Sequence, residues 1–220
     1  MEDNNYGVVI GAANIDIGGT PYKPLIPGDS NPGVIKMSYG GVGRNIAHNL
    51  ALLGINAELV TATGNDPLGM EMLKNCEKIG MDTSLSVMVP DASSSVYLFI
   101  NDEKGEMDLA LSHVDIVNHI TPEYIESISD VINSASIVIA DCNLSQETIL
   151  KIKETCKVPL YADLNHFCGG CTHNKAGCKS TCQCRSHIVE SRSQSRACYD
   201  RNEQFSEEKH PQEKHSCCYA

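Results

Sequence analysis

Along the first 163 residues, short apolar runs alternate with longer stretches in which apolar residues recur every three or four positions. The runs are rich in Val and Ile, as in YGVVIGAA from Tyr6 and SIVIADCN from Ser136. Such runs predict buried strands, and the recurring pattern predicts amphipathic helices. The expected strands are 6–13, 34–38, 57–64, 136–143 and 158–163. The expected helices are one that stops at Gly54, then 66–80, 121–133 and 145–156.

Residues typical of helix ends support these limits. Asp66 and Thr121 each precede a proline and are expected to be N-caps, as is Ser145, while Gly54 and Gly80 are expected to end their helices. In the first helix, one apolar stripe is expected, with Arg44 and His48 off it. The stripe consists of Ile46, Ala47, Leu50, Ala51 and Leu53.

Strands separated by helices predict right-handed βαβ units, and therefore an α/β fold with a parallel sheet flanked by helices. Ligands in such folds bind beyond the carboxyl ends of the strands. The segment 85–111 differs, because its two polar-alternating strands are joined by NDEKGE. This pattern predicts a β-hairpin that forms a flap instead of part of the core.

The net charge of −11 argues against a protein that binds nucleic acid or an anionic membrane, since either would require a basic surface. No apolar run reaches the roughly 18 residues needed to cross a membrane. The N-terminus MEDNNYGVVIGAA is acidic and has no long apolar region, so no signal peptide is predicted. A cytoplasmic protein is expected.

Composition changes sharply at Asp163. Residues 1–163 contain 9 Lys and Arg against 22 Asp and Glu, whereas residues 164–220 contain 8 against 6. The second part also holds eight of the eleven cysteines, with only one Leu, one Ile and one Val. So little apolar surface cannot offset the entropy lost on folding. We therefore expect a folded domain over 1–163 and an unstructured Cys/His-rich tail over 164–220.

The tail admits two interpretations. Its cysteines and histidines are dense enough for zinc, and Cys168 and Cys171 have the spacing of a zinc knuckle. The later cysteines follow a C-x-x-x-C-x-C pattern that matches no known finger spacing. The alternative is a shifted reading frame, indicated by the abrupt loss of apolar periodicity. The candidate ligands are His166, Cys168, Cys171, His173, Cys178, Cys182 and Cys184.

The stretch GGVGRNIAHNLALLG, residues 40–54, places three glycines before a helix. It fits neither the P-loop nor the dinucleotide fingerprint, because no Lys follows the glycines and Ile46 stands where the third glycine should be. Bare backbone at a helix N-terminus lets a ligand approach closely and offers free N–H groups. Asn45, together with Asn14 and Asp16 after the first strand, would suit a ribose or another polyol. Alternatively, the glycines serve only tight helix–sheet packing and Asp16 caps a turn.

At these residues the sequence resembles the ribokinase-like, or PfkB, carbohydrate kinase family. The family's first signature extends over twenty-five residues here. The resemblance covers about 6–163 and implies a sheet flanked by helices with a small β lid, built from strands near 34–38 and 85–111. The signature is matched by Gly40, Gly41, Gly43, Asn45, Ala47, Gly54 and Gly64.

The resemblance also implies an activity and a site. Family members transfer the γ-phosphate of ATP, with Mg²⁺, to a sugar or nucleoside hydroxyl, and their lids often pair two subunits, which implies a homodimer. The small-molecule substrate would be a nucleoside or a sugar, bound by its hydroxyls. Asn143 falls where many members have a Glu that faces the substrate. The implied substrate-binding residues are Asn14, Asp16, Gly40, Gly41, Gly43, Asn45 and Asn143.

One departure from the family pattern limits the expected activity. The second signature, Asp-Thr-x-Gly-Ala-Gly-Asp, supplies the general base and the anion hole in the family, and no such run occurs in the chain. No catalytic residue is therefore assigned, and the nucleotide-binding region is expected to be missing. The sequence predicts a chain that binds substrate weakly and does not turn over. The alternatives are a non-catalytic truncated product with a substrate-binding remnant, or a metal-binding protein that acts through its tail.

Overall fold

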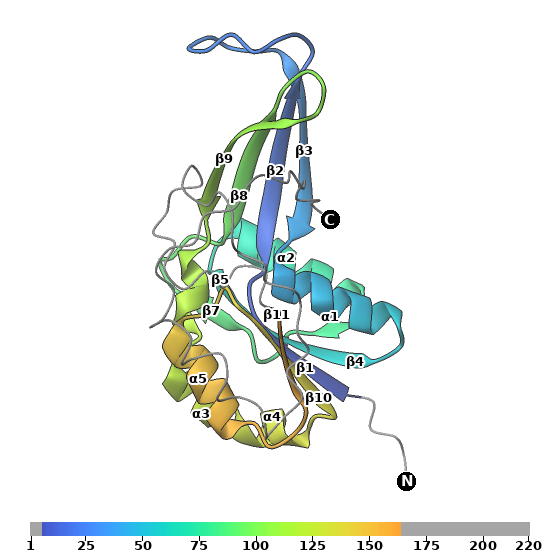
Figure 1. The fold of residues 1–220 in the computed structure, drawn as a ribbon, viewed down its shortest axis with the longest axis vertical. Helices are drawn as coiled ribbons and strands as arrows, with labels where there is room; N and C mark the ends of the chain where they lie inside the picture. The colour runs from blue at the N-terminus through green and yellow to red at the C-terminus, as the bar shows by residue number, and fades with distance from the viewer. Residues whose placement is uncertain (1–5, 164–220) are drawn as a thin grey trace, which may run out of the picture. The chain divides into compact units, whose positions relative to one another are not determined.

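The computed structural model describes residues 6–163, so the predicted tail over 164–220 lies outside the described residues. Its centre is a five-stranded parallel sheet in the order β11-β10-β1-β4-β6 (Figure 1). Val8, Val9 and Ile10 of β1 are completely buried in the middle of this sheet. The strands are β1 (Tyr6–Ile10), β4 (Asn56–Val60), β6 (Met81–Asp82), β10 (Ile137–Asp141) and β11 (Leu160–Asp163).

Helices cover both faces of the sheet, as the sequence predicted. One face packs its side chains, including Val9, against α1 (Val42–Leu52) and α2 (Pro67–Lys78). The other face, including Val8, packs against the remaining helical segments. These are η1 (Asp115–His119), α3 (Pro122–Ser127), α4 (Ser129–Ser134) and α5 (Gln146–Thr155). The three expected N-caps are confirmed, since Asp66, Thr121 and Ser145 each accept a hydrogen bond from a backbone N–H of the first turn.

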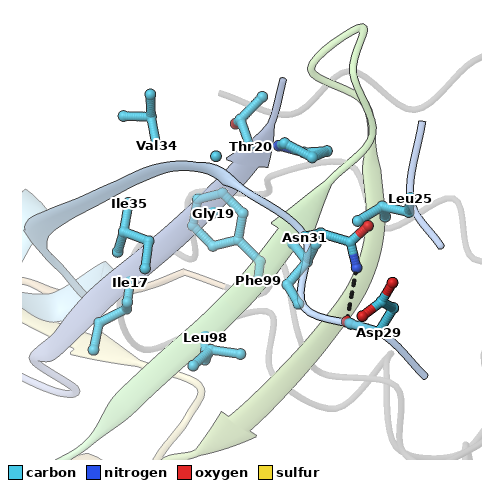
Figure 2. A pocket seen from close by; sticks show the side chains of 13 residues that line it. Ile17, Gly19, Thr20, Leu25, Asp29, Asn31, Val34, Ile35, Leu98 and Phe99 are labelled. Atoms are coloured by element: carbon cyan, nitrogen blue, oxygen red, sulfur yellow. Dashed lines mark hydrogen bonds between the residues drawn. The ribbon is translucent and has the colours of Figure 1, made fainter. Parts of the chain in front are cut away.

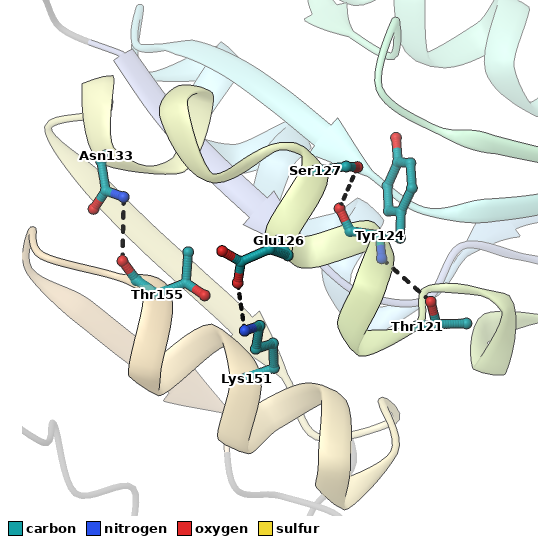
Figure 3. A network of polar contacts seen from close by, with 7 residues as sticks. All are labelled: Thr121, Tyr124, Glu126, Ser127, Asn133, Lys151 and Thr155. Carbon is teal, nitrogen blue, oxygen red and sulfur yellow. Dashed lines mark hydrogen bonds and ion pairs between the residues drawn. The ribbon is translucent and has the colours of Figure 1, made fainter.

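The predicted helix 121–133 is wrong in one respect, because the chain leaves the helix at Ile128 and re-enters it as α4. Polar contacts tie these two short helices to α5 (Figure 3). The ammonium of Lys151 pairs with the carboxylate of Glu126, and Asn133 donates to the carbonyl of Thr155 at 3.1 Å. The apolar spacing of Ile125, Ile128 and Ile132 continues across the break, so the sequence pattern gave no sign of it.

A second sheet forms the lid, with strands in the order β3-β2-β8-β9 (Figure 1). Its strands are β2 (Asn14–Pro21), β3 (Gly33–Gly40), β8 (Val96–Asn101) and β9 (Met107–His113). β8 and β9 form the predicted hairpin, and β3 contains the predicted strand 34–38. A separate parallel pair consists of β5 (Ala62–Gly64) and β7 (Val87–Val89).

Two strand predictions need correction. The predicted strand 6–13 ends at Ile10, and Asn14 and Asp16 belong to β2, a strand that the sequence analysis did not predict. The predicted strand 57–64 is divided at Thr61, so that β4 and β5 belong to different sheets. In both cases the local sequence remains compatible with strand, and pairing partners far along the chain decide where each strand ends.

The first helix also differs from its predicted stripe. Leu53 follows the last residue of α1 and is 76% exposed, whereas Arg44 is 7% exposed. Burial of Arg44 is tolerable because its guanidinium donates to three oxygens, and buried charges need such partners. Gly54 ends the helix as predicted, with φ at 77°. Across 6–163, every helix is too short and too polar to cross a membrane.

Candidate functional site

The acidic residue proposed from sequence lies where the lid meets the central domain. Asp16 is the third residue of β2, and its carboxylate accepts a hydrogen bond from the Asn14 amide. That carboxylate lies directly over Gly40 at the end of β3, since a Cβ added to Gly40 would come within 2.2 Å of Asp16 Oδ2. Partial burial raises the pKa of Asp16, while the Asn14 hydrogen bond and the charge of Arg44 oppose that shift. Asp16 therefore does not cap a turn.

Arg44 connects the start of α1 to the lid. Its Nη1 donates to the carbonyl of Tyr39 at 3.4 Å and to Oδ1 of Asn45 at 3.1 Å, and its Nη2 donates to Oδ1 of Asn75 at 3.3 Å. The hydrogen bond from Arg44 holds the Asn45 side chain in place, with its Oδ1 as the acceptor. Asn45 is exposed and keeps its amide hydrogens available to an incoming group. Arg44 is thus a buried positioning residue, although it lies off the apolar stripe that the sequence predicted.

The glycines before α1 are needed for close packing. Gly41 has φ at 97°, and a Cβ there would lie 2.5 Å from the carbonyl oxygen of Ala12. A Cβ on Gly43 would lie 2.8 Å from the backbone of Gly11. Close packing therefore requires glycine at these two positions, and their part in substrate binding stays a prediction. Gly40 differs, because its missing side chain makes room for Asp16.

The prediction of free N–H groups at this helix start is wrong for two of them. The N–H of Gly43 donates to Asp141 Oδ2 at 3.2 Å, and the N–H of Arg44 donates to the carbonyl of Ala12 at 3.1 Å. The protein itself therefore satisfies donors that are often available at a helix N-terminus. Any ligand recognition here depends more on Asp16, Asn14 and Asn45 than on these two backbone groups.

Asp141 at the end of β10 connects β10 to the segment after β1 and to the start of α1, and the sequence analysis missed this residue. This carboxylate is 2% exposed and accepts four hydrogen bonds. Its Oδ2 binds the N–H of Ala12 at 2.9 Å and that of Gly43, while its Oδ1 binds the N–H and the side-chain amide of Asn143. An Asp at the end of an apolar run was the available signal, because a buried carboxylate must find donors.

Asn143 lies next to Asp141 with its side chain half-buried. Its Nδ2 donates to Asp141 Oδ1 at 2.7 Å, so that one of its amide hydrogens is already occupied. Through Asp141 it is connected to the start of α1. The structure thus brings the seven candidates together at the carboxyl ends of β1 and β10. Their roles in binding a substrate stay predictions. Residues 6–163 contain no cluster of three or more acidic, His or Cys side chains that could hold a metal ion.

Two hollows lie further along the lid sheet. The first has a volume of about 330 Å³, and Figure 2 shows Leu25, Asp29 and Asn31, from the connection between β2 and β3, beside its apolar wall. Asn31 donates to the carbonyl of Asp29, which helps to shape this connection. The second hollow, of about 410 Å³, is lined by Gly18, Thr20, Val34, Lys36, Phe99 and Asn101.

A parallel sheet flanked by helices, with a separate mixed sheet attached at the candidate site, defines the α/β ribokinase-like fold. The chain belongs to the pfkB family of carbohydrate kinases, whose family model matches residues 4–166. The resemblance noted at the glycine signature is thereby confirmed.

Curated relatives include nucleoside and sugar kinases. The chain is 42% identical to the pseudouridine kinase of Escherichia coli (strain K12) over 164 residues, which cover 74% of this chain and 52% of that protein. It is 32% identical to the pseudouridine kinase of Arabidopsis thaliana, over 69% of this chain and 39% of that protein. The chain spans about half the length of the curated relatives it matches.

Solved structures show the same fold. A putative sugar kinase from Clostridium perfringens is 30% identical, with a TM-score of 0.66 over 72% of this chain and 51% of that chain. Arabidopsis thaliana ribokinase, in a complex with ribose and ATP, is 19% identical, with a TM-score of 0.65 over 73% of this chain and 53% of that chain. The second likeness concerns the fold alone.

Proposed function

We propose that residues 6–163 form the substrate-binding part of an ATP-dependent nucleoside kinase of the pseudouridine type. The main observation behind this proposal is the arrangement of Asp16, Asn14 and Gly40. The half-buried carboxylate of Asp16 lies over the backbone of Gly40 and accepts a hydrogen bond from the side-chain amide of Asn14. A carboxylate can accept hydrogen bonds from two neighbouring hydroxyls, and hydrogen bonds to a charged group are the stronger ones. Asn45 and Asn143 would add amide donors to the sugar from the other side.

The nucleoside preference rests on the relatives. Two proteins named pseudouridine kinase, one bacterial and one from a plant, match 74% and 69% of this chain. In the whole protein, we propose, the γ-phosphate of ATP passes to the 5′-hydroxyl of the ribose. Kinases of this family use ATP, and Mg²⁺ is part of the proposal. Because residues 6–163 offer no cluster of acidic ligands, we derive no step through the metal.

A second candidate is a non-catalytic protein that binds the nucleoside without phosphorylating it. This candidate rests on the same arrangement, because Asp16, Asn14 and Asn45 can bind a sugar without transferring a group to it. Incubation of the chain with ATP, Mg²⁺ and pseudouridine separates the two: ADP formation that depends on pseudouridine favours the kinase, and binding without turnover favours the second candidate.

A metal-binding role for the tail concerns residues outside the described part, and zinc analysis of wild type against Cys171→Ser tests it.

Asp16→Asn is expected to weaken ribose and pseudouridine binding by about 10- to 100-fold, because a charge-assisted hydrogen bond contributes about 1.5–3 kcal/mol. Isothermal titration calorimetry without ATP measures the effect. Since burial raises the pKa of Asp16, wild-type affinity should begin to fall at a higher pH than for an ordinary Asp. Asp108→Asn, on an exposed part of β9, is the matched control and should bind like wild type. Equal affinity of Asp16→Asn and wild type would remove the proposed role.

We also propose that a second copy of the chain covers the apolar face of the lid sheet. Alternation along the paired strands places apolar side chains from all four strands on this face, and Ile35 and Leu111 are 77% and 66% exposed. A surface of this kind marks an interaction site, and a two-fold axis lets one patch bind itself. They include Ile17, Ile35, Met37, Leu98, Ile100, Leu109 and Leu111.

The proposed assembly predicts a dimer in sedimentation velocity at micromolar concentration. Leu111→Lys, which places a charge at the centre of this face, should shift the chain to monomer, because the charge would have to be buried without a partner. A wild-type chain that sediments as a monomer over the whole concentration range would contradict the proposal. The substitution lies on the sheet face opposite to Asp16, so nucleoside binding by the monomer serves as a test of correct folding.

A further inference from the structure

The segment 90–95 carries the chain from the central domain into the lid. It lies between β7 and β8, forms neither helix nor strand, and places Asp91 at a positive φ of 57°. Ser94 and Ser95, at the end of this segment, are nevertheless only 2% exposed. Since the segment belongs to no helix or strand, other contacts must fix its course.

The carboxylate of Asp66 supplies such contacts. Its Oδ2 accepts a hydrogen bond from the N–H of Ser94 at 2.7 Å, and its Oδ1 accepts one from the Ser94 hydroxyl at 2.8 Å. Oδ1 also accepts from the N–H of Gly69 at 2.7 Å, which makes Asp66 the N-cap of α2. One carboxylate thus joins the start of a helix of the central domain to the entry of the lid.

The charge of Asp66 strengthens this connection. Burial alone would raise the pKa of Asp66, but the hydrogen bonds from Ser94 and Gly69 outweigh burial and lower the pKa. The carboxyl group is therefore ionised at neutral pH. Hydrogen bonds to an ionised group are about twice as strong as those between neutral groups.

Two glycines allow the segment to approach so closely. A Cβ on Gly64 would lie 2.2 Å from the carbonyl oxygen of Ala92, and a Cβ on Gly69 would lie 2.4 Å from Oγ of Ser94. The N–H of Gly64 also donates to that Oγ at 3.0 Å. Gly64 belongs to the glycine signature but takes no part in the proposed sugar site. The packing of segment 90–95 gives this glycine a role of its own.

The segment leads directly to the proposed sugar site. The carbonyl of Ser95 accepts a hydrogen bond from the N–H of Ile15 at 3.0 Å, and the next residue, Val96, begins β8 opposite Ile15. Ile15 is followed by Asp16 on β2. A shift of Ser95 would therefore move the end of β2 on which the Asp16 carboxylate lies.

We propose that the contact between Asp66 and Ser94 anchors the lid to the central domain and thereby sets the position of Asp16. Asp66 and Ser94 are then positioning residues, because they act through β8 and β2 and not on the sugar itself. The effect on binding rests on the proposed function, since it requires a sugar at Asp16. The anchoring of the lid requires no ligand.

Asp66→Asn separates the anchor from the helix cap. Asparagine is as good an N-cap as aspartate, so α2 keeps its start, but an amide has only one oxygen and the N–H of Ser94 loses its acceptor. In the full chain, hydrogen exchange of β2 and β8 should become about 3- to 30-fold faster, the range found for changes in coupling between sites. Exchange in β1 should stay as in wild type. Calorimetric titration with ribose should show weaker binding by a similar factor.

Thr121→Ala is the matched control. Thr121 caps α3 through the N–H of Tyr124, as Asp66 caps α2, but α3 packs against α5 and not against the lid. This variant should lower the melting temperature and leave both lid exchange and ribose affinity unchanged. Ser94→Ala removes the hydroxyl that Asp66 and Gly64 share, and should reproduce the effects of Asp66→Asn.

The outcomes separate the anchor from the proposed function. If β2 and β8 of Asp66→Asn exchange at wild-type rates, the anchor is wrong. If exchange rises equally in β1, β2 and β8, Asp66 supports overall stability only, and the anchor is again wrong. If lid exchange rises while ribose affinity stays at the wild-type value, Asp66 does not position Asp16. If lid exchange rises but wild type binds neither ribose nor pseudouridine, the anchor stands and the proposed function fails.

Discussion

Asp141→Ala should destabilise the domain by about 4 kcal/mol, because it leaves several buried donors without partners. The N–H groups of Ala12 and Gly43 lose their acceptor, and each unsatisfied buried group costs about 1–3 kcal/mol. A domain of this kind has only about 5–15 kcal/mol of total stability, so the loss is a large fraction of it. Thermal and urea unfolding followed by circular dichroism measure the change.

Two further variants sharpen this test. Asp141→Asn keeps one oxygen for the two backbone donors and should lose less than Asp141→Ala. Asp108→Ala removes an exposed aspartate from β9 and is expected to change stability by less than about 0.5 kcal/mol. If Asp141→Ala unfolds at the same urea concentration as Asp108→Ala, the carboxylate does not hold the junction together. Nucleoside binding should decline with Asp141→Ala in any fraction that stays folded, because the start of α1 loses its tie to β10.

Gly41→Ala is expected to cost about 3–4 kcal/mol and to abolish measurable ribose binding. The backbone there has φ at 97° and ψ at 133°, a region that strains any residue with a side chain by about 1–3 kcal/mol. The added Cβ would also lie 2.5 Å from the carbonyl oxygen of Ala12 and 2.6 Å from the Cα of Ala13. Since both are backbone atoms, the start of α1 must move away from the connection between β1 and β2, and Asn45 moves with it.

Gly54→Ala separates the effect of backbone strain from the effect of a clash between the added Cβ and neighbouring backbone. Gly54 also has a positive φ, at 77°, but nothing lies within 4 Å of the position that a Cβ would take. Its substitution should therefore cost about 1 kcal/mol, from backbone strain alone, and leave ligand binding unchanged. If Gly41→Ala and Gly54→Ala unfold at the same temperature, close backbone approach is not the reason for a glycine at Gly41.

Local signals in the sequence were sufficient for the starts of three helices, although they missed the break between α3 and α4. Asp66, Thr121 and Ser145 cap their helices as predicted, because a cap is an interaction between residues three positions apart. The hairpin of β8 and β9 follows from its own turn for the same reason. The family signature added the lid and the site region, which the structure places at one end of the parallel sheet.

The extent of the lid did not follow from the sequence. Glycines within a strand are unexpected from the sequence alone, yet Gly18 of β2 accommodates the Phe99 ring, and Gly40 of β3 accommodates the Asp16 carboxylate. The partner of each glycine lies on another strand: Phe99 is 81 residues from Gly18, and Asp16 is 24 residues from Gly40. No short window along the chain contains both partners, so the local sequence did not predict β2.

The sequence by itself determined the α/β class, the helix ends and the family, because periodicity, caps and a glycine signature are all properties of neighbouring residues. Only the tertiary structure decided the roles of the charged groups. Asp141 and Arg44 look like ordinary polar residues in the sequence but are buried among donors and acceptors from other elements. Glu58, on a central strand, has its pKa raised to about 7 by burial and by the nearby Asp82. Burial and partner geometry fix what a charge does, and both arise only when distant segments pack together.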